Sequence, residues 1–142
     1  MQYMLLIYVD PATYADMTEA QGQAEMAEYF ALGPSLRERG IKMSGEGLQP
    51  ITTATTVRVR DGQALVTDGP FAETKELLAG YWVWKVKDMD EAIEWARRAP
   101  NTGVDEGILE LRPFVTAEDF GEALTPELEA KEDELRNRTQ GS

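Results

Sequence analysis

The chain has 142 residues, with 26 Asp and Glu against 14 Lys and Arg, and a formal net charge of −12. At this length we expect one domain with one hydrophobic core, and the negative charge disfavours binding to nucleic acid or to anionic membranes. The chain contains no cysteine and no histidine, which excludes disulfides, thiolate or Ser–His nucleophiles and imidazole metal ligands, so any proton transfer must use Asp, Glu, Lys or Tyr.

The first predicted element is a strand over residues 3–9, YMLLIYV. It is apolar at both alternating sets of positions, as in strands that are covered on both faces. The N-terminal stretch lacks the basic residues of a signal peptide and is too short for a membrane span, so we expect a cytoplasmic protein. Thr18 and Gln21 then form a capping box for a helix. Within it, Gly33-Pro34 predicts a kink or a restart before Gly40 ends the helix.

Residues 41–50 predict a weaker strand, in which Gly45 and Gly47 indicate a bulge or a close backbone approach. Residues 55–68, TTVRVRDGQALVTD, predict a hairpin with Asp61-Gly62 at the centre of a type I′ turn. That turn pairs Val57 with Val66 and places Asp68 on the apolar side of the hairpin.

The second half of the chain predicts a strand over residues 77–86, a helix from an Asp88–Glu91 capping box to Arg98, and a strand over residues 107–115. Thr125 then caps a polar helix that carries acid and base pairs four residues apart. The inner face of the second helix and the core tryptophans are predicted to be Met89, Ala92, Ile93, Ala96, Trp82, Trp84 and Trp95.

The predicted order is strand, helix, strand, hairpin, strand, helix, strand. This is the α+β plan of a ferredoxin-like split βαβ sheet with an inserted hairpin, followed by a helical tail. Two helices cover only one face of such a sheet, whereas the strands over residues 3–9 and 77–86 are apolar on both faces. Leaving that second face in water would cost many kcal/mol. We therefore predict a homodimer that pairs the sheet faces.

Five stretches resemble YCII-related (YciI-like) proteins of the DGPF type: YMLLIY, GEGLQP, TDGPFAETKE, DMDEAIEWARRAP and LELRPF. The resemblance covers residues 1 to about 115. It implies a bacterial protein with a dimeric α+β barrel and a cleft between sheet and loops, so we assign a family domain to residues 1–117 and an acidic helical extension to residues 118–142.

The resemblance implies no settled reaction. Some relatives are similar to proteins encoded beside extracytoplasmic-function sigma factors, which makes a sigma factor a candidate partner. The His–Asp pair ascribed to shorter YciI-like relatives cannot form in a chain without histidine.

Three acids and an arginine lead the candidates for a site. Asp68, in the DGPF stretch, is either a cleft acid or base or the cap of an Asx turn. Arg112 and Glu110 alternate with apolar residues on the last strand, where they form either a structural ion pair or an anion site. Glu46 and the neighbouring Ser44 are candidates because the adjacent glycines let a ligand approach.

Three further residues complete the set. Phe71 is either a hydrophobic anchor or a platform for substrate, Lys75 belongs to a solvated turn or a lid, and Tyr8 is a core residue or a proton donor. No phosphate loop, dinucleotide fingerprint or calcium loop occurs in the sequence, so we predict no cofactor and no metal, with magnesium held by carboxylates alone left open.

Three functions stay open at this point. The first is a small-molecule enzyme or binding protein with a carboxylate and arginine cleft for a small polar or anionic ligand. The second is a non-catalytic regulatory or accessory protein linked to a sigma factor. The third is a structural dimer without a ligand.

Overall fold

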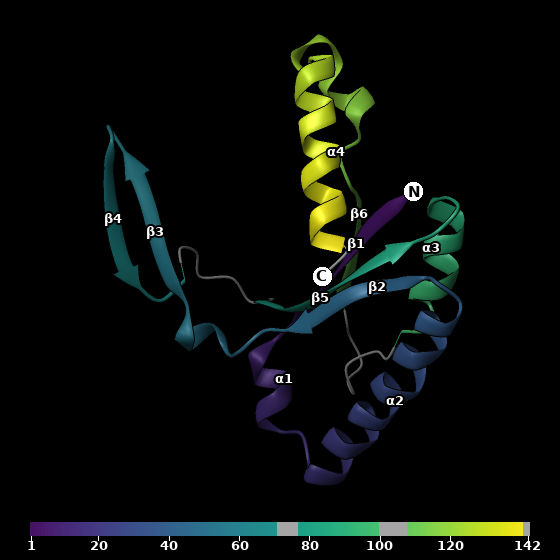
Figure 1. Ribbon diagram of the computed structural model, residues 1–142. Helices are drawn as coiled ribbons and strands as arrows, with labels where there is room; N and C mark the ends of the chain where they lie inside the picture. Colours follow the sequence, from purple (N-terminus) through teal and green to yellow (C-terminus); the bar gives the residue numbers. More distant parts are fainter. Residues whose placement is uncertain (71–76, 100–107, 141–142) are drawn as a thin grey trace.

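The computed structural model describes residues 1–70, 77–99 and 108–140. Figure 1 shows the course of the chain. Its elements, in order, are β1 (Gln2–Val9), α1 (Pro11–Ala15), α2 (Glu19–Glu38), β2 (Lys42–Gly47), η1 (Ile51–Thr53), β3 (Thr55–Arg60), β4 (Gln63–Asp68), β5 (Leu77–Lys85), α3 (Met89–Ala96), β6 (Ile108–Pro113), η2 (Ala117–Ala123) and α4 (Pro126–Gln140).

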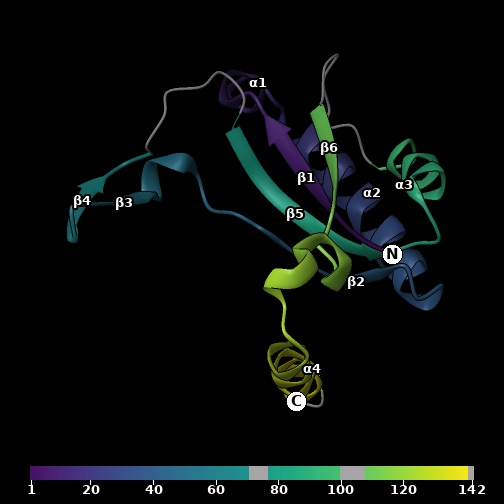
Figure 2. The same ribbon diagram turned by 90° about the horizontal axis from the view of Figure 1, so that it is seen from above.

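Four strands form an antiparallel sheet in the order β2-β5-β1-β6. The two strands that are central in this order, β1 and β5, are the two whose sequences are apolar on both alternating sets. Helices α2 and α3 lie on one side of the sheet, and α4 lies on the other (Figure 2). The order and the helix placement agree with the predicted α+β, ferredoxin-like plan.

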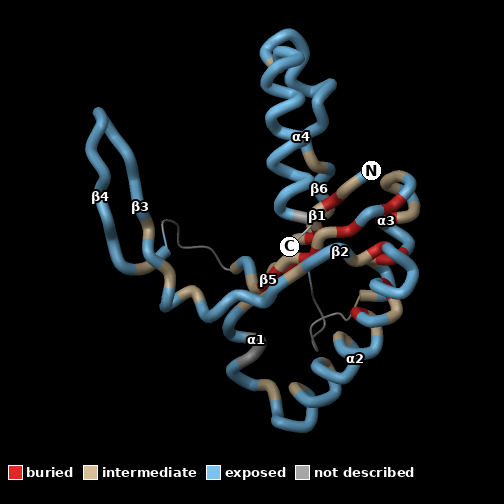
Figure 3. Tube along the Cα trace, viewed as in Figure 1, coloured by how far each residue is buried: buried red, intermediate tan, exposed pale blue. Residues whose placement is uncertain are grey.

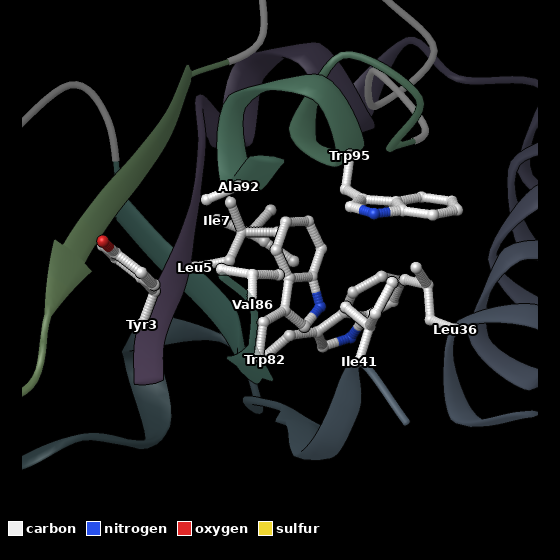
Figure 4. Close-up of a cluster of buried hydrophobic side chains, with 10 residues drawn as sticks. Tyr3, Leu5, Ile7, Leu36, Ile41, Trp82, Val86, Ala92 and Trp95 are labelled. Atoms are coloured by element: carbon white, nitrogen blue, oxygen red, sulfur yellow. The ribbon is translucent and has the colours of Figure 1, made fainter. Parts of the chain in front are cut away.

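The core lies between the sheet and the helices α2 and α3. Alternate residues of β1 point into it, and Leu5, Leu36 and Trp84 are completely buried. Figure 4 shows Ala92 and Trp95 reaching from α3 towards the side chains of the sheet. All three tryptophans are buried, as predicted, and the full cluster is Tyr3, Leu5, Ile7, Leu36, Ile41, Trp82, Trp84, Val86, Ala92 and Trp95.

Helix α3 differs from its prediction in two details. Asp88 caps it by accepting from the N–H of Glu91 at 3.0 Å, but the Glu91 carboxylate accepts from the N–H of Lys87 at 2.7 Å rather than from that of Asp88. The predicted reciprocal box is therefore displaced by one residue. Ile93, predicted on the inner face, is 38% exposed, because Ala92 and Trp95 are the buried positions of this short helix.

Helix α2 begins at the predicted capping box, in which Thr18 and Gln21 each accept from the other's backbone N–H. It runs as one helix through Pro34, so the predicted restart does not occur. Proline removes a single N–H, while the buried residues on either side of it, Gly33 and Leu36, keep the helix packed on the core. The helix ends as predicted at Gly40, which has a φ of +70°.

Strand β2 shows both of the alternatives predicted for it. Its register against β5 shifts between Lys42 and Ser44. At Gly45 a Cβ atom would lie 2.6 Å from the carbonyl oxygen of Tyr81, so only glycine fits between the two backbones.

Strands β3 and β4 form a separate two-stranded sheet. Its register pairs Val57 with Val66, as predicted, and both turn residues, Asp61 and Gly62, have the positive φ that a type I′ turn requires. The hairpin extends away from the four-stranded sheet and is exposed along its length (Figures 1 and 3). Its exposed apolar side chains are Val57 at 58%, Val59 at 75%, Leu65 at 61% and Val66 at 68%.

The chain ends in a polar helix, as predicted. The hydroxyl of Thr125 accepts from the N–H of Leu128 at 3.3 Å, and two predicted pairs form, Glu132 with Arg136 at 2.6 Å and Glu134 with Arg138 at 2.8 Å. Within the described ranges, no helix is both long enough and apolar enough to cross a membrane.

Candidate functional site

The side of the sheet away from α2 and α3 carries the second set of alternating residues. We call it the open face. Strand pairing aligns its side chains in two rows that run across the sheet. One row is Ser44, Val83, Met4 and Arg112, and the other is Glu46, Tyr81, Leu6 and Glu110.

A polar trio occupies the β1–β6 side of this face. The hydroxyl of Tyr8 donates to Oε2 of Glu110 at 3.2 Å, and Nε of Arg112 lies 3.5 Å from Oε1 of the same carboxylate. Each oxygen of Glu110 therefore has its own partner, one from β1 and one from β6. The ion pair predicted as one alternative for Glu110 and Arg112 is present.

The trio is accessible from solvent. The Arg112 side chain is 71% exposed and that of Glu110 is 44% exposed. Because the contact with Glu110 uses Nε, the outer end of the guanidinium is available to a carboxylate or phosphate oxygen. The arrangement is thus a positioned arginine beside a partly exposed carboxylate.

The surroundings of Tyr8 keep its phenol protonated. Burial raises its pKa above the ordinary value of 10.0; the hydrogen bond to Glu110 and the charge of that carboxylate act in the same direction, and Arg112 opposes them. Tyr8 is therefore neutral near neutral pH, where its O–H donates to Glu110, and it is not suited to act as a base.

Two predicted residues lie on the opposite edge of the open face. Ser44 and Glu46 project from β2, with β5 and β1 between them and β6. Three strand spacings separate Glu46 from Glu110, which amounts to about 14 Å. Within one chain Glu46 and the trio share a surface without direct contact.

Asp68, the first candidate from the sequence, lies elsewhere. It is exposed at the end of β4, opposite Thr55 on the hairpin that extends away from the sheet (Figure 1). The turn after it is held by backbone contacts, since the N–H of Gly69 donates to Ala54 and the hydroxyl of Thr56 donates to the Gly69 carbonyl, both at 2.7 Å. The other predicted residues of this loop, Phe71 and Lys75, lie outside the described residues.

Sequence reasoning did not foresee the groove beside the trio. A cavity of ≈ 810 Å³ lies between the open face and the C-terminal extension, and its lining includes Arg112 from the sheet and Arg136 from α4. Its apolar lining includes Leu6 from β1 and Phe120 from η2. Of the three leucines spaced along the tail, Leu124, Leu128 and Leu135, only Leu124 lines the groove, so its sequence signal is weak.

Residues 1–117 match the family model of the YCII-related domain. The chain belongs to the YCII-related family. It is also similar to a protein of Rhizobium meliloti (strain 1021) described only as uncharacterised, with 34% identity over 114 residues that cover 80% of this chain and 92% of that protein.

This YCII-related match includes all of the open face and every member of the trio. Helix α4, which carries Arg136, lies beyond residue 117. The trio therefore belongs to the family domain, whereas one wall of the groove is contributed by the extension. Among the described residues, no three acids are grouped so that they could hold a metal ion.

Proposed function

We propose that this YCII-related protein is a small-molecule enzyme or binding protein whose ligand site is the trio of Tyr8, Glu110 and Arg112. The observation that supports this most directly is the bridging carboxylate on a sheet face that is otherwise mainly apolar. A sheet face needs no such group for stability, because an apolar side chain there costs no desolvation.

Each member of the trio has a distinct role in the proposal. Arg112 binds an oxyanion group of the ligand, and Tyr8, whose single O–H donates to Glu110, fixes the position of that carboxylate. Glu110 holds both donors in place and is the candidate base. The ligand class is a small metabolite with a carboxylate or similar anionic group, which reaches the trio from the groove of ≈ 810 Å³ that Arg112 lines.

Binding of two small carboxylates tests this role for Arg112. We expect malonate and 4-hydroxybenzoate to show saturation-transfer NMR signals with the wild-type protein. Arg112→Gln should weaken binding by about tenfold, because a charge-assisted contact is lost. Arg138→Gln, which makes the same charge change on α4, is the control and should leave binding unchanged. Equal losses in both variants, or no signal from the wild type, would reject the proposal.

We further propose that the protein is a homodimer formed through the open faces. One chain leaves two apolar surfaces partly uncovered, the open face, on which Ile108 is 46% exposed, and the hairpin, on which Val59 is 75% exposed. A two-fold assembly covers both when each hairpin reaches the partner's sheet. Such an assembly also brings Asp68 of one chain towards the trio of the other, which gives the DGPF stretch a part in the site.

Analytical ultracentrifugation tests the dimer. We expect the wild type to sediment as a dimer at micromolar concentration and Leu6→Glu to sediment as a folded monomer, since a carboxylate at the centre of the open face opposes pairing. Glu129→Gln on α4 is a control that should remain dimeric. A well-folded wild-type monomer would contradict the dimer without bearing on the ligand site of one chain.

The extension favours a second function, contact with a protein partner. Leu128 and Leu135 of α4 are 52% and 54% exposed on a helix that is otherwise polar. The candidate partner is an extracytoplasmic-function sigma factor from the same genome. Direct binding of the purified factor, measured with the full chain and with a variant lacking residues 119–142, tests this; binding that survives the deletion, or none at all, would reject it.

A further inference from the structure

A second cavity lies where the end of α2, the start of β2, the end of β5 and helix α3 converge; Figure 1 shows the course of these elements. A cavity of ≈ 600 Å³ opens there, and three basic residues line it: Arg39, Lys85 and Lys87. We call it the basic cavity. Its lining shares only Met1 with that of the groove on the open face.

Positive charge gathers around this cavity although the whole chain carries −12. The residues that line it include three bases, Arg39, Lys85 and Lys87, against one acid, Glu91.

Helix termini explain only part of this cluster. Basic residues at the ends of α2 and α3, such as Arg39 and Arg98, complement the helix dipoles. Lys85 and Lys87 follow a strand instead, so the dipoles give no reason for them. The acid that lines the cavity, Glu91, already accepts from the backbone N–H of Lys87 at 2.7 Å.

Trp95 lines the cavity and lies close to two arginines, of which Arg39 also lines it. Trp95 is 8% exposed, and the guanidinium groups of Arg39 and Arg98 lie 5.3 and 4.7 Å from the centre of its ring. Arg98 also forms an ion pair with Glu94 at 3.5 Å, so its positive charge is partly compensated. The contact with Trp95 holds the Arg39 side chain in place beside the cavity. Less side-chain entropy is therefore lost when Arg39 binds a ligand.

We propose that the basic cavity binds a small molecule that carries two or more oxyanion groups of the phosphate or carboxylate type. Arg39, Lys85 and Lys87 supply the contacts, and the volume of ≈ 600 Å³ is that of a site for a metabolite. The site stands apart from the trio on the open face, so it adds a second ligand, such as a regulator or cosubstrate, to the protein.

Isothermal titration calorimetry with pyrophosphate and with citrate, at a constant ionic strength of about 0.15 M, tests the proposal. We expect at least one of the two to bind. A double variant, Lys85→Ala with Lys87→Ala, should weaken binding by about tenfold or more, because two charged contacts are lost. The matched control, Lys131→Ala with Arg138→Ala on α4, should change it by less than about twofold.

The outcomes distinguish a phosphate ligand from a carboxylate ligand, and the basic cavity from the open face. Tighter binding of pyrophosphate assigns the phosphate class, and tighter binding of citrate assigns the carboxylate class. Arg112→Gln should leave this binding unchanged, because Arg112 lies on the open face. Absence of binding by both probes, equal losses in the two double variants, or loss in Arg112→Gln would overturn the basic cavity as a site.

Discussion

The two faces of one sheet differ although the same strands form both. On the covered face, Leu5 and Trp84 are fully buried under α2 and α3. On the open face, the neighbouring residues of the same strands include Tyr8 and, on β6, the pair Glu110 and Arg112, in partial contact with solvent. Successive residues of each strand point to opposite faces of the sheet. One face therefore forms the core, and the other can carry polar side chains that are hydrogen-bonded and still accessible to solvent.

Truncation of adjacent residues of β5 should show the largest contrast. Trp84→Ala empties a fully buried site and is expected to lower the free energy of unfolding by about 3–5 kcal/mol. Val83→Ala, one residue away on the open face, should cost the single chain less than about 1.5 kcal/mol because its site is partly exposed. Urea unfolding followed by circular dichroism measures both. Equal losses would mean that something covers the open face as fully as the helices cover its reverse.

Two glycines of β2 offer the next contrast. Gly45→Ala places a Cβ 2.6 Å from the Tyr81 carbonyl and should cost about 1–3 kcal/mol through strain. Gly47→Ala meets nothing within 4 Å and should be close to neutral. Thermal unfolding of both variants distinguishes them, and a neutral Gly45→Ala would show that β2 moves freely away from β5.

Tyr29 gives the covered face a response to alkaline pH. Burial first, then the charges of Glu25 and Glu28, raise its pKa from 10.0 to about 12. Because the pKa is raised on folding, its stabilising contribution is complete below pH 10 and is lost as the pH rises through about 12. Partial exposure of the ring limits this loss to about 1–2 kcal/mol. Tyr29→Phe should flatten the fall in stability over this range in urea titrations, and an unchanged slope would contradict the assignment.

Tyr8→Phe tests the open face with the smallest expected effect. It removes the 3.2 Å hydrogen bond to Glu110 and should cost about 0.5–1.5 kcal/mol. The tyrosinate absorbance at 295 nm should lose a component that titrates above pH 10, because the pKa of Tyr8 is raised. Tyr81→Phe, on the same face, is the control. If the absorbance component that Tyr8→Phe removes has an ordinary tyrosine pKa, Tyr8 does not form the hydrogen bond to Glu110.

Features with a local cause could be predicted from the sequence. The hairpin register follows from Asp61-Gly62, and the start of α2 follows from Thr18 and Gln21, because each depends on residues that are near in the chain. Burial of the tryptophans follows from their size and from the alternation of β5. Of the two alternatives predicted at Pro34, the restart is wrong, because packing of Leu36 on the core outweighs one missing backbone hydrogen bond.

Features that depend on the alignment of strands far apart in the chain could not be predicted from the sequence. Glu110 and Arg112 were paired from their spacing on one strand, but the third member, Tyr8, is 102 residues away from Glu110 in sequence. Its contact depends on how β1 aligns with β6, which no local pattern fixes. The separation of Glu46 from Glu110 likewise follows from the strand order β2-β5-β1-β6.

The central position of β1 in the sheet has a consequence for synthesis. Its neighbours in the sheet are β5, which begins at Leu77, and β6, which begins at Ile108. The hairpin of β3 and β4 needs only its own residues and can form within microseconds, whereas β1 is synthesised before both of its partners and must wait for them. The apolar side chains of β1 therefore stay unpaired until β5 has been made, so we expect a chaperone to bind nascent β1.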